Sequence, residues 1–307
     1  MNEGKYFDID LNQKYVETEY IKELTNRAFA YAESGFPVHL RGASGVGKTA
    51  LAFHIAKKIG RPIVFMCGSE EFSNADLIGG YFGTKKSLVV DNYISSVLKR
   101  KEEVKKMWTD GRLVTACKNG YTVIYDEFTR ARPEINNVLL SVLEEQMIDI
   151  PNYSTENTYM KIHPDFRMIF TSNPEEYVGV YKSANALIDR MITMDINDMD
   201  LETEKLIIVS KSGVTDREAK IITNITRYIR NNSNEKTWLS IRCSIMLGKI
   251  IKKLDIKIDP YNQMFKKVCK DVYNSPSVVL GVNVLEKEKY YLLIDRAINS
   301  AFINCKI

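Results

Sequence analysis

Residues 42–49 read GASGVGKT, and this stretch decides the fold. It matches the pattern G-x-x-x-x-G-K-[ST] of a phosphate-binding loop, in which glycines let backbone N–H groups surround phosphate oxygens at the start of a helix. The apolar run Phe36–Leu40 before it predicts a strand, and the pattern of Lys48–Ile59 after it predicts a helix. The competing interpretation is a glycine turn with a chance Lys-Thr pair. The strand and helix on either side favour the phosphate loop.

Each residue type in this loop has a defined use toward a nucleotide. Lys48 is expected to reach the β- and γ-phosphates as a catalytic cation, and Thr49 to place its hydroxyl on Mg²⁺. The predicted nucleotide contacts run from the first glycine into the first helical turn: Gly42, Ala43, Ser44, Gly45, Val46, Gly47, Lys48, Thr49 and Ala50.

Two further strand ends carry polar groups. The apolar run Val123–Tyr125 ends in Asp126 and Glu127, and ligands of open α/β sheets lie at such carboxyl ends. We expect Asp126 to hold Mg²⁺ and Glu127 to act as general base toward the attacking water. A solvated turn after a core strand is the alternative. Asn173, at the end of the next apolar run, is a candidate catalytic residue that would bind the water or a γ-phosphate oxygen, and Pro174 after it favours a non-helical exit.

The wider pattern predicts an α/β fold, with a parallel sheet between helices and a smaller all-helical lid domain. Strands alternate with helices up to Asp200, a plausible helix cap, and helices alone follow. We therefore expect a P-loop core over residues 1–200 and a helical lid with a C-terminal segment over 201–307. The other expected strands are Pro62–Cys67, Tyr121–Tyr125, Phe166–Thr171 and Ile192–Ile196. The other expected helices are Glu19–Ser34, Asn92–Met107, Glu134–Glu145 and Ala184–Asp189.

Composition and charge exclude several classes of protein. The 307 residues are 45% apolar and 27% charged, and no run approaches the ~20 apolar residues of a membrane-spanning helix. No secretory signal pattern begins the chain, and five scattered cysteines indicate neither a zinc site nor a disulfide framework, so we expect a cytoplasmic protein without a membrane role. Residues 1–200 carry a net charge of −4 and residues 201–307 one of +8. Lysine-rich solvated helix faces explain this asymmetry better than a nucleic-acid surface, which we do not expect.

Several longer stretches give the chain a family resemblance. The residues that carry it are FPVHLRGASGVGKT, GSEEFSNADLIGG, VVDNYISSVL, VIYDEFTRARPEINNVLLSVLEE, HPDFRMIFTSNPEEY and LIDRMITMDI, which together span about 36–196. The series resembles AAA+ ATPases of the MoxR type and, more closely, the gas vesicle protein N family. The run from Val123 is the most specific of these stretches, because so long a match rarely arises by chance.

The resemblance implies an ATPase that uses ATP and Mg²⁺, assembles as a homo-oligomeric ring, expected to be a hexamer, and remodels proteins. Its clients would be gas vesicle structural or accessory proteins, and it would be cytoplasmic, in association with gas vesicles. Arg190 matches the arginine that such rings direct at a neighbour's γ-phosphate, with Arg130 and Arg132 as rivals. Arg242 matches the second sensor arginine of the lid, although Ile241 stands where many relatives have proline. The alternatives are a MoxR-type chaperone that activates a metalloenzyme, a nucleotide-gated scaffold with little turnover, and a nucleic-acid motor.

Overall fold

The computed structural model describes residues 15–71, 73–91, 99–150, 158–173, 186–233, 239–274 and 284–303. Contacts between residues divide this part of the chain into two compact units. The sheet unit contains residues 28–41 and 49–195. The helical unit contains 15–27, 42–48 and 196–303, so that the phosphate loop is grouped with the helices and not with the sheet. Helix α1 (Glu19–Glu33) contributes residues to both units.

The sheet unit is built on five parallel strands in the order β2-β5-β8-β1-β9. All five strands were expected from the sequence, and the parallel α/β prediction is confirmed. The register places the strand ends at one edge, since Cys67 lies beside Asp126, and Arg41 lies between Ser172 and Asp195. The strands are β1 (Val38–Arg41), β2 (Ile63–Cys67), β5 (Thr122–Asp126), β8 (Arg167–Ser172) and β9 (Ile192–Asp195).

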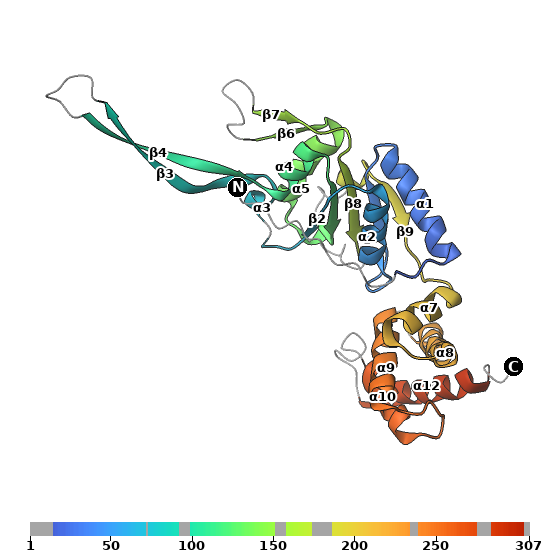
Figure 1. Ribbon diagram of the computed structural model, residues 1–307. Helices are drawn as coiled ribbons and strands as arrows, with labels where there is room; N and C mark the ends of the chain where they lie inside the picture. Colours follow the sequence, from blue (N-terminus) through green and yellow to red (C-terminus); the bar gives the residue numbers. More distant parts are fainter. Residues whose placement is uncertain are drawn as a thin grey trace. The chain divides into compact units, whose positions relative to one another are not determined.

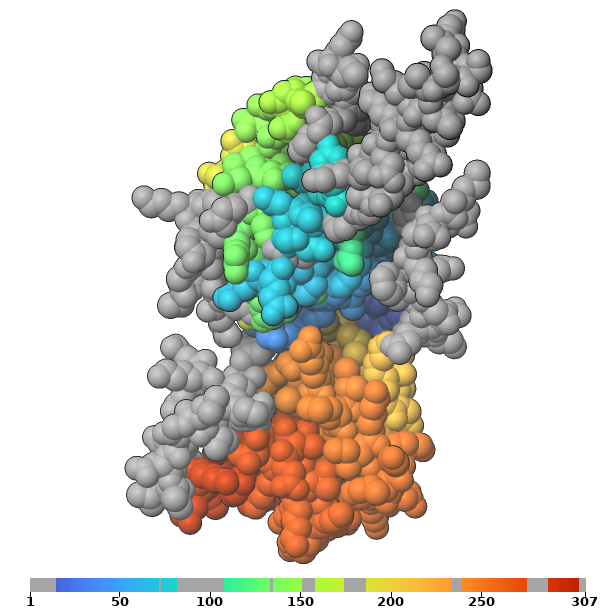
Figure 2. All heavy atoms as spheres, turned by 90° about the vertical axis from the view of Figure 1, so that its left-hand side faces the viewer, coloured from blue at the N-terminus to red at the C-terminus, as the bar shows by residue number. Residues whose placement is uncertain are grey.

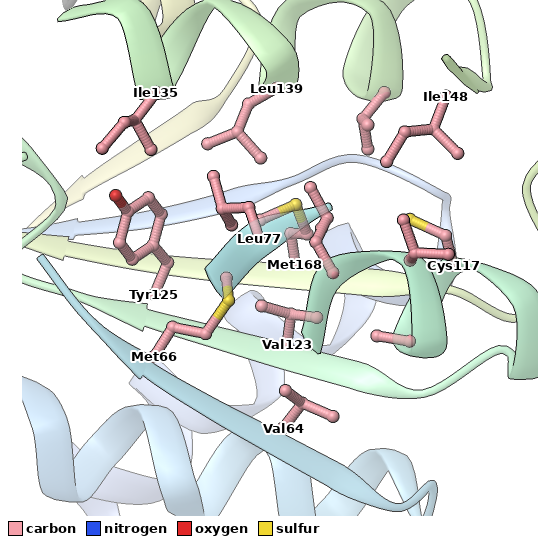
Figure 3. Close-up of a cluster of buried hydrophobic side chains, with 14 of the residues drawn as sticks. Val64, Met66, Leu77, Cys117, Val123, Tyr125, Ile135, Leu139, Ile148 and Met168 are labelled. Atoms are coloured by element: carbon pink, nitrogen blue, oxygen red, sulfur yellow. The ribbon is translucent and has the colours of Figure 1, made fainter. Parts of the chain in front are cut away.

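Helices cover both faces of this sheet (Figure 1). On one face lie α4 (Arg112–Asn119) and α5 (Pro133–Glu144), and on the other lies α2 (Lys48–Ile59). Figure 3 shows Ile135 and Leu139 of α5 above Tyr125 and Met168 of the sheet, in a cluster of buried side chains. Every side chain of β5 is buried, which is typical of a strand in the interior of a parallel sheet. The core therefore fixes the strand that carries Asp126 at its end.

One predicted element is wrong. We expected a charged helix over Asn92–Met107, whereas β4 (Lys99–Asp110) is a strand that pairs in antiparallel fashion with β3 (Gly79–Asp91). Residues 92–98 lie outside the described residues. Lysine and glutamate favour a helix locally, but Val89, Val90 and Tyr81 of β3 favour a strand, and pairing with β3 overrides the local preference of β4.

Several short elements, among them the 3-10 helix Phe128–Arg130, also belong to the sheet unit. Helix α3 (Asn74–Leu77) precedes β3, and a second hairpin joins β6 (Met147–Asp149) to β7 (Tyr159–Lys161). Of the helix expected over Ala184–Asp189, residues 186–188 form a helical turn, and 184 and 185 lie outside the described residues.

The helical unit has a core of its own, and Figure 2 shows its orange and red atoms packed closely together. Asp200 caps its first helix by accepting a hydrogen bond from the Thr203 backbone N–H at 2.9 Å, as the sequence predicted. In the core, the Thr226 hydroxyl lies 2.9 Å from the Tyr273 hydroxyl and 2.8 Å from that of Ser244. The helices are α7 (Leu201–Ser212), α8 (Asp216–Asn232), α9 (Ile241–Leu254), α10 (Gln263–Tyr273) and α12 (Val284–Ile303). Within the described ranges, none of the helices has the length and apolar character needed to span a bilayer.

Candidate functional site

The phosphate loop, residues 42–48, joins the end of β1 to the start of α2. Gly45 and Gly47 adopt positive φ angles of 83° and 89°, which side chains rarely tolerate. The loop therefore has the turned backbone that phosphate-binding loops use to present N–H groups. The ammonium group of Lys48 donates to the carbonyls of Gly42 (2.9 Å) and Ala43 (2.8 Å), and the residue is only 8% exposed. Lys48 is thus held within the loop.

A hydrogen-bonded group of side chains lies at the carboxyl edge of the sheet. The Thr49 hydroxyl donates to Oδ1 of Asp126 at 2.8 Å, and the Thr171 hydroxyl donates to the same oxygen at 2.5 Å. Asp126 is 9% exposed and Thr171 is fully buried. Residues of α2, β5 and β8 thus converge on one carboxylate.

Glu127 follows directly and has an unusual backbone. Its φ of 51° and ψ of 40° lie in the left-handed region, which is uncommon for a residue with a side chain and often marks a functional site. The Glu127 backbone N–H donates to the Thr171 hydroxyl at 3.0 Å, so that Thr171 links both acidic residues. The Glu127 carboxylate lies 2.6 Å from Nη1 of Arg130, in an ion pair within the same turn.

Asn173 comes immediately after β8, two residues beyond Thr171. It is 7% exposed. Ser172 before it is fully buried, and its hydroxyl shares a hydrogen bond of 2.7 Å with Nε2 of His39. Asn173 therefore follows directly the strand that carries Thr171, which bonds Asp126. Pro174 lies outside the described residues.

The candidate arginines occupy four different places. Arg190 donates through Nε and Nη2 to Oε2 of Glu144 at 2.9 and 2.6 Å, and through Nη1 to the Ala186 carbonyl at 2.7 Å. Arg130 is paired with Glu127, and Arg132 is an exposed residue that precedes α5. Arg242 is exposed in the first turn of α9. None of the four is among the side chains that bond to Asp126 in the hydrogen bonds given above.

Three residues that position this site were not identified from the sequence. Thr171 is a strand threonine, a type too common to signal a role. Gly68 donates its backbone N–H to the Asp126 carbonyl at 2.8 Å, and a Cβ at this position would lie 2.3 Å from the Glu127 carbonyl oxygen. The third is His39, whose ring bonds Ser172 and, through Nδ1, the Thr193 hydroxyl at 3.0 Å. The signal for His39 in the sequence was its position within the predicted strand Phe36–Leu40.

The burial of His39 has a consequence for stability. Burial, assisted by the nearby charge of Arg41, lowers the pKa of His39 to about 4. As pH falls below ~6.5, His39 becomes protonated in the unfolded chain, whereas in the folded chain it stays neutral until about pH 4. The free energy of unfolding therefore decreases over this window.

We predict that His39→Gln removes this pH dependence. The stability advantage of the original chain over the variant should be constant above about pH 7 and shrink by roughly 1.4 kcal/mol per pH unit between ~6.5 and ~4. Denaturant unfolding at several pH values measures this difference. His163→Gln, at a partly exposed histidine, is the control. This variant should keep the decrease in the free energy of unfolding that we attribute to His39. A pH-independent difference for His39→Gln would contradict the prediction.

The residues present fit a nucleotide and Mg²⁺. The loop offers a turned backbone with two positive-φ glycines and a buried lysine, which suit phosphate oxygens. The hydroxyl of Thr49 and the carboxylate of Asp126 are oxygen donors, the type that Mg²⁺ prefers. Mg²⁺ is usually bound by one or two protein groups together with phosphates and water, so these two oxygens would suffice.

Comparison with known proteins shows the family to which this sequence is similar. Residues 37–191 match the family described as AAA domain (dynein-related subfamily). The chain is 40% identical over 263 residues to the gas vesicle ATPase GvpN of Ancylobacter aquaticus, covering 85% of this chain and 73% of that protein. It is 35% identical to the gas vesicle ATPase GvpN of Haloferax mediterranei, over 86% of this chain and 75% of that protein.

The fold is also found among solved structures. NtrX from Brucella abortus, in complex with ADP, matches with a TM-score of 0.53 at 15% identity, over 94% of this chain and 64% of that one. At this identity the likeness concerns the fold alone.

Proposed function

This chain belongs to the AAA ATPase family, among the gas vesicle ATPases of the GvpN type, and from this premise we propose that it hydrolyses ATP with Mg²⁺ to remodel proteins during gas vesicle assembly. The observation that carries the proposal is a pair of hydrogen bonds to Asp126. One comes from the hydroxyl of Thr49, which directly follows the phosphate loop, and the other comes from the hydroxyl of Thr171. This convergence supports the proposal because it gathers oxygen donors, the type of ligand that Mg²⁺ prefers.

The reaction assigns each group a task. Water attacks the γ-phosphorus, the bond from that phosphorus to the β–γ bridging oxygen breaks, and the proton of the water passes to the Glu127 carboxylate. Lys48 stabilises charge on the β- and γ-oxygens, and Asn173 orients the water or a γ-oxygen. Thr49 and Asp126 would hold Mg²⁺, which when bound neutralises charge on the phosphates. The left-handed turn at Glu127, fixed by Thr171 and Gly68, sets the direction of the carboxylate.

The larger assembly is part of the proposal. We assign Arg190 to the site of a neighbouring subunit in a homo-oligomeric ring, taken as a hexamer, and Arg242 to a second sensor in a lid that begins near residue 201. The clients are gas vesicle structural or accessory proteins, and the protein acts in the cytoplasm, at gas vesicles. The names of the two relatives favour this role over activation of a metalloenzyme. A turnover assay with and without vesicle proteins separates a motor from a scaffold with little turnover.

Lys48→Ala tests the nucleotide site. Removal of a buried cation from phosphate oxygens should raise the Kd for ATP on the order of a hundredfold, as for other truncated buried charge pairs. Fluorescence titration with a labelled ATP analogue measures this. Lys57→Ala, which removes an exposed lysine from the same helix, is the matched control and should bind as the original chain does. Equal affinity of the Lys48 variant and the original chain would refute the site.

A further inference from the structure

A buried carboxylate in the helical unit is held between two arginines. Glu204, in the first turn of α7, is 4% exposed. Its Oε2 accepts a hydrogen bond from Nε of Arg227 at 2.8 Å, and its Oε1 accepts one from Nη1 of Arg230 at 2.5 Å. Both arginines lie on α8, and the side chain of Arg230 is only 9% exposed. Such a cluster requires a specific geometry, since a buried charge is costly without its partners.

Each arginine also donates to a backbone carbonyl outside α7 and α8. Nη2 of Arg227 bonds the carbonyl of Met199 at 2.5 Å, and Nε of Arg230 bonds that of Leu239 at 2.6 Å. Met199 lies on the segment that leads from β9 into α7, and Leu239 lies just before α9. Glu204 therefore fixes two chain segments indirectly, by orienting the two guanidinium groups that hold them.

These two segments form the wall against which the phosphate loop packs. A Cβ at Gly45 would lie 2.3 Å from Cβ of Ser240, and one at Gly47 would lie 3.0 Å from Cε of Met199. A small hollow of about 10 Å³ is lined by Gly45, Val46, Glu204, Arg230 and four residues of the two segments. That is about the space of a single water, so the hollow next to the loop is small. The backbone of the loop therefore lies close to both segments, most closely to Ser240 at Gly45.

We propose that Glu204 is a positioning residue for nucleotide binding, which acts through Arg227 and Arg230 on the conformation of the phosphate loop. The proposal rests on the proposed function, since it concerns the same nucleotide. An apolar core would hold helices together as well as this cluster does, and the rest of the helical unit uses one. The charged groups add a defined geometry, because each guanidinium group can bond both the carboxylate and a backbone carbonyl in only one arrangement.

The test is Glu204→Gln, which keeps the shape and removes the charge. Glutamine can accept a hydrogen bond from one arginine only, because its NH₂ group faces the donors of the other. One carbonyl contact should then loosen, and with it the wall beside Gly45 or Gly47. We expect the Kd for ADP and the KM for ATP to rise on the order of tenfold, within the usual range of coupling between sites, while kcat at saturating ATP stays within about twofold.

Asp295→Asn is the matched control. Asp295 forms the ion pair with Lys270 at 2.8 Å that joins α10 to α12, so its variant also removes one acidic charge from an ion pair between helices of the helical unit. Its Kd for ADP should stay within about twofold of the original value. An equal rise in both variants would assign the effect to general loosening of the unit and overturn the proposal.

Arg227→Lys is a second test of the proposal if Glu204→Gln does not fold. Lysine keeps the charge but cannot bond Glu204 and the Met199 carbonyl in the same fork geometry, so the Kd should rise several-fold. Unchanged affinity in a folded variant, or a loss of kcat without a change in KM, would overturn the positioning role. Failure of the original chain to bind ADP would instead refute the proposed function, so the two failures are distinguishable.

Discussion

Glu127→Gln is expected to leave ATP bound and to reduce turnover on the order of a thousandfold, within the range attributed to general bases. Glutamine keeps the size and the backbone turn of Glu127, so the binding of phosphates by the loop should be unaffected. It cannot accept the proton of the attacking water at neutral pH. Equilibrium binding of labelled ATP and single-turnover hydrolysis measure the two effects separately.

The ion pair of Glu127 with Arg130 supplies the competing explanation for such a loss. Arg130→Gln breaks the same 2.6 Å contact and keeps the carboxylate, so it should retain most of the turnover. If both variants lose turnover equally, the ion pair or a role of Arg130 itself, and not the base alone, explains the loss. If Glu127→Gln loses ATP binding instead, the division of roles between Asp126 and Glu127 is wrong.

The parallel sheet could be predicted because its signals are local. Each of its strands is a short apolar run, and helices have start and stop signals of their own, such as Gly60 after α2 and Asp200 before α7. Thr49 and Asp126 could be proposed as site residues because a short motif and a strand end assign them to one edge of such a sheet. Their direct hydrogen bond, across 77 residues of sequence, agrees with that expectation.

The hairpin of β3 and β4 could not be predicted in the same way. Lys99–Lys106 is rich in residues that favour helices, and the information that makes it a strand lies in its partner, Thr84–Asp91. No pattern within one of the two segments reports that they pair. The same limit explains why Gly68 and Thr171 were missed: a glycine after a strand and a threonine within one have many uses, and only the fold shows that both contact the Asp126–Glu127 turn.

Arg190 illustrates the limit for a site between subunits. The family resemblance implies a role for it in a neighbour's site, while the structure pairs it with Glu144, 46 residues earlier. Both side chains are partly exposed, at 32% and 59%, and ion pairs of this kind contribute about 0–1 kcal/mol. Arg190 can therefore leave Glu144 at little cost if a γ-phosphate of a neighbouring subunit is the stronger partner. A purely structural role within its own chain is the alternative.

Arg190→Ala separates these roles, and we expect it to keep ATP binding and reduce turnover on the order of a thousandfold or more, as for other arginine fingers. Glu144→Ala breaks the same ion pair but keeps the guanidinium, so it should retain turnover; a structural role would make the two variants equal. Mixing then tests whether Arg190 acts across subunits. Arg190→Ala subunits keep an intact loop, and Lys48→Ala subunits keep the arginine, so mixed rings contain interfaces where both are intact and activity should return. If demonstrably mixed rings stay inactive, Arg190 does not serve its neighbour, and Arg132, exposed before α5, becomes the next residue to test.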